Sequence, residues 1–372
     1  MMNHSSSWTR RSILKAGAAA TLGVSGAAYA NGRDRLKIGY LPVNVMLPVY
    51  NEEAGFWKDA GLDVELFRAQ GGPAILQALL SGAIPAGDVG VAPAVIAASR
   101  KLPFYFLTLA SVSTPDHPLD RIMVRKDSEL RSFRDLRGKT LAIPQKGTQP
   151  DAALVAAEKV FGVKKSEINL LPVPYPNMAQ VLQQGQVDAI YPFPPADTVA
   201  EVQDGARTIA ETSDFIPYVG FTTLAVRRDF ADANPAVVRK LIKGAVNGQR
   251  WINANPKRAS EVANTALSIP SGIRERTRSA YWSINALPVM ANVHHLYELQ
   301  VAGGIIDPVA DVDAMMKSYF IDPALKFTLP ALQELGMRPD PVVKRMLAAN
   351  YPLLRKPTEA YHTAWDKMLL SL

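Results

Sequence analysis

Short apolar runs, each followed by a loop and a helix that begins near a proline, constrain the fold of this chain most. The clearest examples are Leu36–Tyr40 before Pro48, Val89–Val91 before Pro93, Thr140–Ile143 before Pro150, and Ala189–Tyr191 before Pro194-Pro195. Proline suits the first helical turn because its missing N–H would have no intrahelical partner there. Further apolar runs are Asp63–Phe67, Phe104–Ala110, Ile122–Arg125 and Ile168–Leu171. Strands alternating with helices predict α/β lobes with largely parallel sheets.

The same pattern indicates where a ligand would bind. In open α/β sheets, ligands bind outside the carboxyl ends of the strands. Helix N-termini at that edge offer free N–H groups and the positive end of the helix dipole. Several such helix ends around one crevice would form an anion-binding cleft. The alternative is ordinary strand-to-helix loop chemistry, which also uses proline, and the pattern alone does not separate the two.

After Val226 the pattern becomes helical. Pro235–Ala254 predicts a long amphipathic helix with Asn234 as its N-cap, and Asn255-Pro256 repeats that start signal. The rest of the chain reads as mostly helices, without repeats or low-complexity tracts.

The N-terminal segment has the order of an export signal. Thr9–Lys15 is similar to a twin-arginine motif, although Ile13 replaces the usual Phe, and Ala28-Tyr29-Ala30 is a small-x-small cleavage site. The apolar stretch between them is shorter than the ~20 residues that span a bilayer. We therefore expect export to the periplasm with cleavage after Ala30.

Composition excludes several kinds of site. The chain has no cysteine, so disulfides, thiolate nucleophiles and zinc–sulfur sites are absent. Hydrophobic residues make up 48% and charged residues 20%, which suits a globular body with a sizeable core. The net charge of +7 is spread along the chain without a basic-aromatic stripe, which argues against nucleic acid. His294-His295 cannot easily ligate one metal from adjacent helix positions, so we expect no metal and no cofactor.

Several segments together resemble the nitrate/sulfonate/taurine branch of ABC-transporter substrate-binding proteins. They are Leu36–Tyr40, Glu53–Leu66, Asp88–Ala94, Leu136–Ala142, Gly185–Ala189 and Trp251–Pro256. The resemblance implies a type II periplasmic binding-protein fold with two lobes and the ligand in the cleft between them. It implies a discontinuous lobe 1 (31–112 and 222–320), a lobe 2 (113–221), and a helical C-terminal extension (321–372) of unassigned role.

The resemblance also implies candidate ligand-binding residues, each with a structural alternative. Asn44 is the polar side chain of the first loop, or a solvated loop residue. Gly147, Thr148 and Gln149 open a helix, where Thr148 would contact an oxyanion or only cap the helix. The aromatic candidates, at carried-over cleft positions, would otherwise pack in the core: Tyr191, Phe193 and Tyr218.

The expected function is capture of a small organic anion by hinge closure, for an ABC permease in the inner membrane. The protein is expected to be a monomer and not an enzyme, because related catalytic proteins depend on cysteine or clustered histidines. Nitrate or pyrimidine-precursor binding, a ligand sensor, and a cysteine-independent enzyme remain as alternatives.

Overall fold

The computed structural model describes residues 33–69, 71–354 and 360–372. The predicted export signal and its cleavage after Ala30 lie outside these residues. The thirteen strands of the described part are β1 Asp34–Tyr40, β2 Leu62–Arg68, β3 Ala86–Gly90, β4 Phe104–Phe106, β5 Ser111–Ser113, β6 Arg121–Val124, β7 Thr140–Ile143, β8 Asn169–Pro172, β9 Ala189–Ile190, β10 Arg207–Glu211, β11 Val219–Gly220, β12 Thr222–Arg227 and β13 Tyr281–Trp282.

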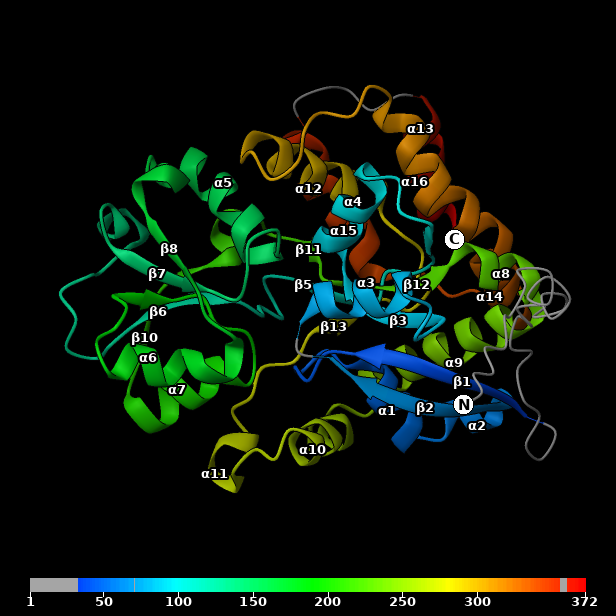
Figure 1. The fold of residues 1–372 in the computed structure, drawn as a ribbon, viewed down its shortest axis with the longest axis horizontal. Coiled ribbons are helices and arrows are strands. Elements are labelled where there is room, and N and C mark those ends of the chain that lie inside the picture. Colours follow the sequence, from blue (N-terminus) through cyan, green and yellow to red (C-terminus); the bar gives the residue numbers. More distant parts are fainter. Residues whose placement is uncertain (1–32, 70, 355–359) are drawn as a thin grey trace, which may run out of the picture.

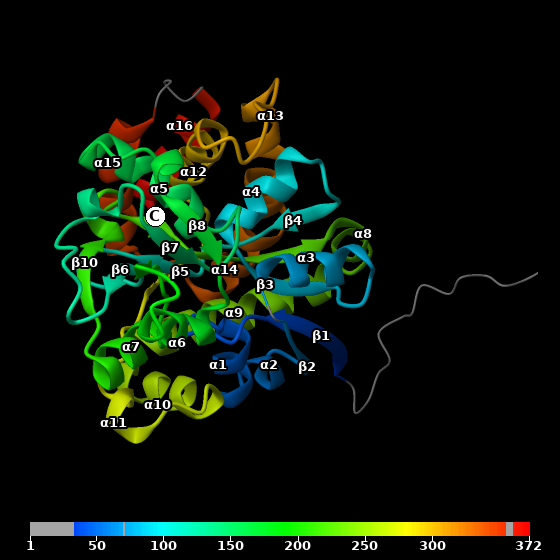
Figure 2. The ribbon, with the colours of Figure 1, turned by 60° about the vertical axis from the view of Figure 1, so that its left-hand side comes forward.

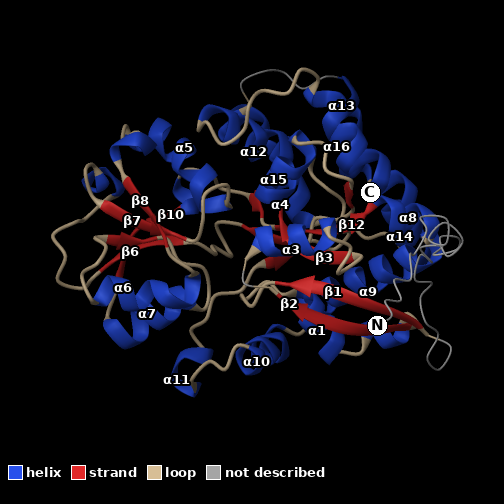
Figure 3. Ribbon diagram, in the orientation of Figure 1, coloured by secondary structure: helices blue, strands red, loops and turns tan. Residues whose placement is uncertain are grey.

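The α-helices of the described part cover both faces of the sheets (Figure 3). They are α1 Leu47–Glu53, α2 Phe56–Asp59, α3 Gly72–Leu80, α4 Val91–Ser99, α5 Gln149–Phe161, α6 Met178–Gln183, α7 Ala196–Asp204, α8 Arg228–Ala233, α9 Pro235–Ala254, α10 Pro256–Ala266, α11 Ser271–Arg274, α12 Met290–Ala302, α13 Val312–Met316, α14 Leu329–Leu335, α15 Pro341–Asn350 and α16 Ala360–Ser371.

Two five-stranded sheets organise the molecule (Figure 1). The first has the order β2-β1-β3-β12-β4, and the second has the order β10-β6-β9-β7-β8. We call the elements around the first sheet lobe 1 and those around the second sheet lobe 2. Lobe 1 draws its strands from the chain before residue 107 and from β12, so it is discontinuous. The residue boundaries proposed from sequence stay a prediction.

A three-stranded sheet in the order β11-β5-β13 carries the chain between the lobes. Strand β5 follows β4 of lobe 1 and precedes β6 of lobe 2, while β11 lies on the return path to β12. Both crossovers therefore pair side by side in one small sheet, Val219 opposite Ser113 and Gly220 opposite Val112.

The prediction of largely parallel sheets is confirmed, because among the described strands only β12 in the first large sheet and only β6 in the second run against the other strands. Strands β1, β2 and β3 pair in parallel, as do β7, β8 and β9. However, β12 is antiparallel to β3 and β4, and β6 is antiparallel to β9 and β10. Both β6 and β12 enter their sheets from the crossovers rather than through a helix of the same lobe. Only strands joined by a helical crossover within one lobe need to be parallel.

Other local predictions agree with the structure to different degrees. The predicted helix Pro235–Ala254 is confirmed at both ends as α9. The predicted strand Phe104–Ala110 is wrong after Phe106, because Leu107 N donates to Leu224 O while Leu109 N donates to Ala286 O. The chain changes partners there, so no single ladder continues.

The C-terminal segment packs on the same side of the molecule as α12 (Figure 1). Helices α13 and α14 are joined through π-helical turns at Lys317–Ile321 and Ala324–Thr328. Asn350 of α15 donates a hydrogen bond to Tyr218 O at 3.2 Å, beside β11. The segment thus contacts the return crossover. Within the described ranges, no helix combines the length and apolarity that crossing a membrane requires.

Candidate functional site: a groove between the lobes

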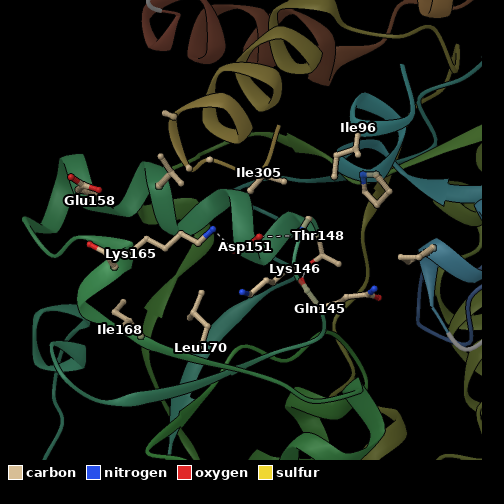
Figure 4. A pocket seen from close by; sticks show the side chains of 18 of the residues that line it. Ile96, Gln145, Lys146, Thr148, Asp151, Glu158, Lys165, Ile168, Leu170 and Ile305 are labelled. Atoms are coloured by element: carbon tan, nitrogen blue, oxygen red, sulfur yellow. Dashed lines mark hydrogen bonds and ion pairs between the residues drawn. The ribbon is translucent and has the colours of Figure 1, made fainter. Parts of the chain in front are cut away.

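A groove of about 860 Å³ lies between the two lobes. Its lobe 1 wall comes from α3 and α4, including Pro73 and Pro93 near their first turns. Its lobe 2 wall comes from the loop after β7, from α5 and from β8, and residues just after α12 complete the lining (Figure 4). The groove therefore borders the first turns of three helices, as the sequence pattern predicts for a ligand site.

The loop between β7 and α5 has a conformation that requires glycine. Gly147 has φ of +79°, in the left-handed region where a Cβ atom is unfavourable. A Cβ atom there would also lie 2.8 Å from Ile96 Cδ1 on the opposite wall. The backbone of this turn consequently approaches lobe 1 more closely than any other residue would permit.

Thr148 is at the N-cap position of α5 but does not act as a side-chain cap in the described structure. Its hydroxyl donates instead to the carbonyl oxygen of Gln145, 2.6 Å away. The next residues, Gln149 and Pro150, begin a helix of 13 residues. The first N–H groups of a helix have no intrahelical acceptor, and a side-chain cap normally satisfies one of them. This end of α5 is accordingly suited to an anion.

Charged side chains around the groove have a positive excess. Four cationic and two acidic residues line it: Arg100, Lys146, Lys164, Lys165, Asp151 and Glu158. Asp151 is 1% exposed, accepts a hydrogen bond from Gly147 N at 2.8 Å, and forms an ion pair with Lys165. Apolar side chains complete the lining, among them Leu76, Ile96, Val155, Leu170 and Ile305. An anionic head with an apolar body matches this lining.

Of the residues predicted from sequence, Gly147 and Thr148 line this groove. Gln149 does not, although its side chain is 7% exposed and neither of its amide atoms has a hydrogen-bond partner in the described structure. Buried side-chain amides without hydrogen-bond partners are rare, so the Gln149 amide can form a further hydrogen bond.

Asn44 lies where the lobes touch directly rather than in the groove. Its backbone N–H donates to Pro194 O of lobe 2 at 3.1 Å. Its side chain accepts from Tyr50 Oη at 3.1 Å and donates to the carbonyl oxygen of Arg278. Both side-chain functions of Asn44 are therefore used within the protein.

Arginines close to this contact add ion pairs. Arg278 binds Glu211 through both terminal nitrogens, at 2.8 and 2.9 Å, and Arg276 binds Glu201 at 2.6 Å. Both arginines belong to the chain between α11 and β13, and Figures 1 and 2 place α11 next to α7 of lobe 2. We call this set of contacts the bridged side; its members are Asn44, Pro194, Glu201, Glu211, Arg276 and Arg278.

The three predicted aromatic contacts also lie outside the groove lining. Tyr191 is fully buried, and its hydroxyl lies 2.5 Å from Thr212 Oγ1. The Phe193 ring packs against Phe221, with centroids 5.0 Å apart. The Tyr218 ring lies 6.0 Å from the guanidinium carbon of Arg345 in the C-terminal segment. Core packing, the alternative weighed from sequence, describes the first two positions.

A buried carboxyl group lies behind the bridged side. Asp120 is 1% exposed, and burial raises its pKa to about 7. Glu211 and Asp197 raise the pKa further through their negative charges. At neutral pH this carboxyl group therefore retains a proton more readily than an ordinary aspartate does, and it lies near Glu211, a member of the ion pairs that join the lobes.

Sequence reasoning missed Lys146, Asp151 and Lys165. Lys146 precedes Gly147 directly, so its position next to the predicted anion site was a usable signal. Lys165 follows α5 and reaches the groove because β8 pairs with β7 in the folded sheet. No local pattern reveals that placement. Asp151 fits the preference for acidic residues in a first helical turn, a pattern with many structural causes.

The described residues contain no group of three or more His, Asp or Glu side chains that could hold a metal ion. His294 and His295 are 5% and 2% exposed on α12, and burial lowers the pKa of His295 to about 4. The two histidines accordingly belong to the packing of α12.

Comparisons with known proteins identify the family. The family model described as NMT1/THI5 like matches residues 44–259, more than half of the chain. The taurine-binding periplasmic protein of Escherichia coli (strain K12) is 31% identical over 204 residues, covering 54% of this chain and 61% of that relative. The alignment thus spans less than two thirds of the relative's length.

Solved structures agree on the fold. The periplasmic nitrate-binding protein NrtA from Synechocystis PCC 6803 has a TM-score of 0.70 at 15% identity, covering 82% of this chain and 90% of that one. The desulfurization enzyme DSZB has a TM-score of 0.60 at 17% identity, covering 82% of this chain and all of that one (100%). With its two lobes joined by paired crossovers, the chain has the type II periplasmic binding-protein fold and belongs to the NMT1/THI5-like family.

Proposed function

We propose that this chain is the periplasmic solute-binding component of an ABC importer and that it captures small organic anions, sulfonates in particular. The observation that carries the proposal is the groove at the start of α5, where cationic side chains outnumber acidic ones and the N-cap hydroxyl leaves the first turn uncapped. A sulfonate is always anionic at neutral pH and accepts several hydrogen bonds. The relative that binds taurine, an aminosulfonate, supports the same ligand class.

The groove also supports a ligand with an apolar body over a bare inorganic anion. Its volume of about 860 Å³ is within the range of sites for drug-sized ligands, roughly 300–1,000 Å³. Apolar side chains line both walls: Ile96 and Leu76 belong to lobe 1, and Leu170 and Val155 belong to lobe 2. A ligand in contact with both walls would stabilise the closed arrangement of the lobes, and the closed form would then dock on an inner-membrane permease.

Calorimetric titration with hexane-1-sulfonate, taurine and nitrate tests the proposal. Hexane-1-sulfonate is expected to bind most tightly, because it alone of the three has an extended apolar body. A ligand at 100 times its dissociation constant should add ~2.7 kcal/mol to the free energy of unfolding. Failure of all three anions to bind would contradict the proposal.

Matched lysine variants test the location of the site. Lys146→Met removes a charge from the loop that precedes α5 and lines the groove, whereas Lys159→Met removes an exposed charge from α5 that does not line the groove. Lys146→Met should weaken hexane-1-sulfonate binding by about tenfold, the equivalent of ~1.4 kcal/mol, and Lys159→Met by much less. Equal effects of the two variants would mean that only long-range charge matters.

The proposal includes binding without turnover, as a monomer in the periplasm. One fold neighbour is an enzyme, so the ligand itself must be followed. Mass spectrometry of hexane-1-sulfonate recovered after prolonged incubation should find it unchanged. Conversion of the ligand by the purified protein would contradict the binding role.

Replacing Arg10 and Arg11 by Lys should block export and leave the precursor in the cytoplasm.

A further inference from the structure

One acidic side chain occupies an unexpected place in a groove suited to anions. Asp151 is the third residue of α5, lines the groove, and is 1% exposed. Its Oδ2 accepts the hydrogen bond from Gly147 N at 2.8 Å, so it holds the left-handed turn that leads into the helix. Its Oδ1 contacts Lys165 Nζ, and Figure 4 shows the Lys165 side chain reaching across to Asp151.

This pair limits the positive charge available at the start of α5. A carboxylate near a bound anion repels it, and low exposure leaves little solvent to screen the repulsion. Lys165, whose side chain is 20% exposed, neutralises Asp151. Arg100, Lys146 and Lys164 then remain around the groove with Glu158, and of these cations Lys146 directly precedes the turn at the α5 N-terminus, which itself carries roughly half a positive charge. A second negative charge on a ligand head bound at that turn would lie beside the buried Asp151 carboxylate, which repels it.

We infer that Asp151, neutralised by Lys165, makes the groove select ligands with a single negative charge and reject dianions. The inference rests on the proposed function, because it concerns the same groove. Asp151 acts in two ways: it positions the Gly147 turn through a hydrogen bond, and it excludes doubly charged heads such as phosphate monoesters and sulfate. Lys165 is the counter-ion of Asp151.

Two probes with the same apolar body isolate the effect of charge. Hexane-1-sulfonate carries one negative charge, and hexyl phosphate at pH 8 carries close to two, since its second pKa is near 6. The parent protein should bind the sulfonate at least about tenfold more tightly than the phosphate. Asp151→Asn keeps an oxygen for Gly147 N and removes the charge, so it should narrow that ratio by about tenfold.

Glu158→Gln is the matched control for Asp151→Asn. It removes the same charge from the same helix and the same groove, but Glu158 lies two turns further along α5 (Figure 4). It should leave the sulfonate-to-phosphate ratio nearly unchanged. Melting of each ligand-free variant shows whether it is folded.

Lys165→Met provides an independent test that does not depend on the Asn variant. It leaves Asp151 without its counter-ion and should weaken hexane-1-sulfonate binding by about tenfold or more. Equal affinities of the parent for both probes, an unchanged ratio in Asp151→Asn, or full affinity in Lys165→Met would overturn the selection. Binding of neither probe by the parent would overturn the proposed function and the selection with it.

Discussion

The two lobes meet in two different ways. On one side they contact each other directly, and on the other side they leave a groove that we propose as the ligand site. On the bridged side, Asn44 binds Pro194 directly, and the Arg278–Glu211 and Arg276–Glu201 pairs surround that contact. On the groove side, the lobes leave about 860 Å³ between α3, α4 and α5. On the bridged side, polar groups of the two lobes form hydrogen bonds and ion pairs with each other. On the groove side, the N-terminus of α5 has no side-chain cap, and cationic side chains outnumber acidic ones.

The contrast predicts different roles for two residues that the sequence marks as ligand contacts. Asn44 joins the lobes, whereas Thr148 lines the groove. Changes on the bridged side should therefore alter stability and the closed arrangement. Changes on the groove side should alter affinity for an anion.

The largest expected effect concerns pH and the bridged side. Burial raises the pKa of Asp120 to about 7 from an ordinary value of 3.8, so the folded state holds a proton that the unfolded state loses. Its contribution to stability is complete below about pH 4 and is lost as the pH rises to 7, by about 1.4 kcal/mol per pH unit. Asp120→Asn should remove the part of the pH-dependent loss of unfolding free energy that comes from this group.

Urea unfolding of the parent and of Asp120→Asn at pH 5, 6, 7 and 8 measures that difference. Other buried groups contribute to both proteins alike: the pKa of Asp366 is raised to about 6, with the same sign, and that of His295 is lowered to about 4, with the opposite sign. The two stability curves should diverge between pH 5 and 7. Parallel curves would show that Asp120 does not titrate in this range.

A smaller effect is expected from the ion pairs themselves. Arg278 and Glu211 form a two-point contact with side chains 24% and 25% exposed, so Arg278→Ala should cost about 2 kcal/mol of unfolding free energy. Arg276 is 56% exposed, and Arg276→Ala should cost at most about 1 kcal/mol. Chemical denaturation measures both. If both variants lost the same unfolding free energy, the solvent exposure of the side chains would not determine how much each ion pair stabilises the protein.

The smallest effect on stability, with the clearest effect on affinity, is expected at the two glycines that flank α5. Gly147 and Gly162 both have positive φ, but a Cβ atom meets Ile96 only at Gly147 and meets nothing within 4 Å at Gly162. Either alanine variant should lose about 1 kcal/mol of stability from backbone strain. Gly147→Ala should in addition weaken hexane-1-sulfonate binding, and Gly162→Ala should not. If calorimetry found the same affinity for Gly147→Ala and the parent, the Gly147 turn would not be part of the ligand site.

Local signals in the sequence account for part of this picture. The apolar run Thr140–Ile143 and the helix start at Thr148-Gln149-Pro150 are joined by a short loop, so the turn at Gly147 could be predicted from the residues around it. The same reasoning gave both ends of α9. These features depend on contacts between residues close in sequence.

Features that depend on distant partners could not be predicted. Strand β5 is short and polar, and it forms only because β11 and β13 pair with it from over 100 residues away. Lys165 reaches Asp151 through the pairing of β8 with β7, and Asn44 meets Arg278 from 234 residues away. Tyr191 and Phe193 are predicted cleft residues, and contacts with Thr212 and Phe221 respectively bury them outside the groove lining. Residue type and spacing do not indicate which residues distant in the sequence will be in contact in the folded protein.

A crystal structure of the protein with hexane-1-sulfonate tests the central claim most directly. The account predicts the sulfonate at the Gly147–Gln149 turn, within hydrogen-bond distance of the first N–H groups of α5 and near Lys146, with the hexyl chain against Ile96 or Leu170. A sulfonate bound among Asn44, Arg278 and Tyr218, with the groove occupied only by water, would contradict it.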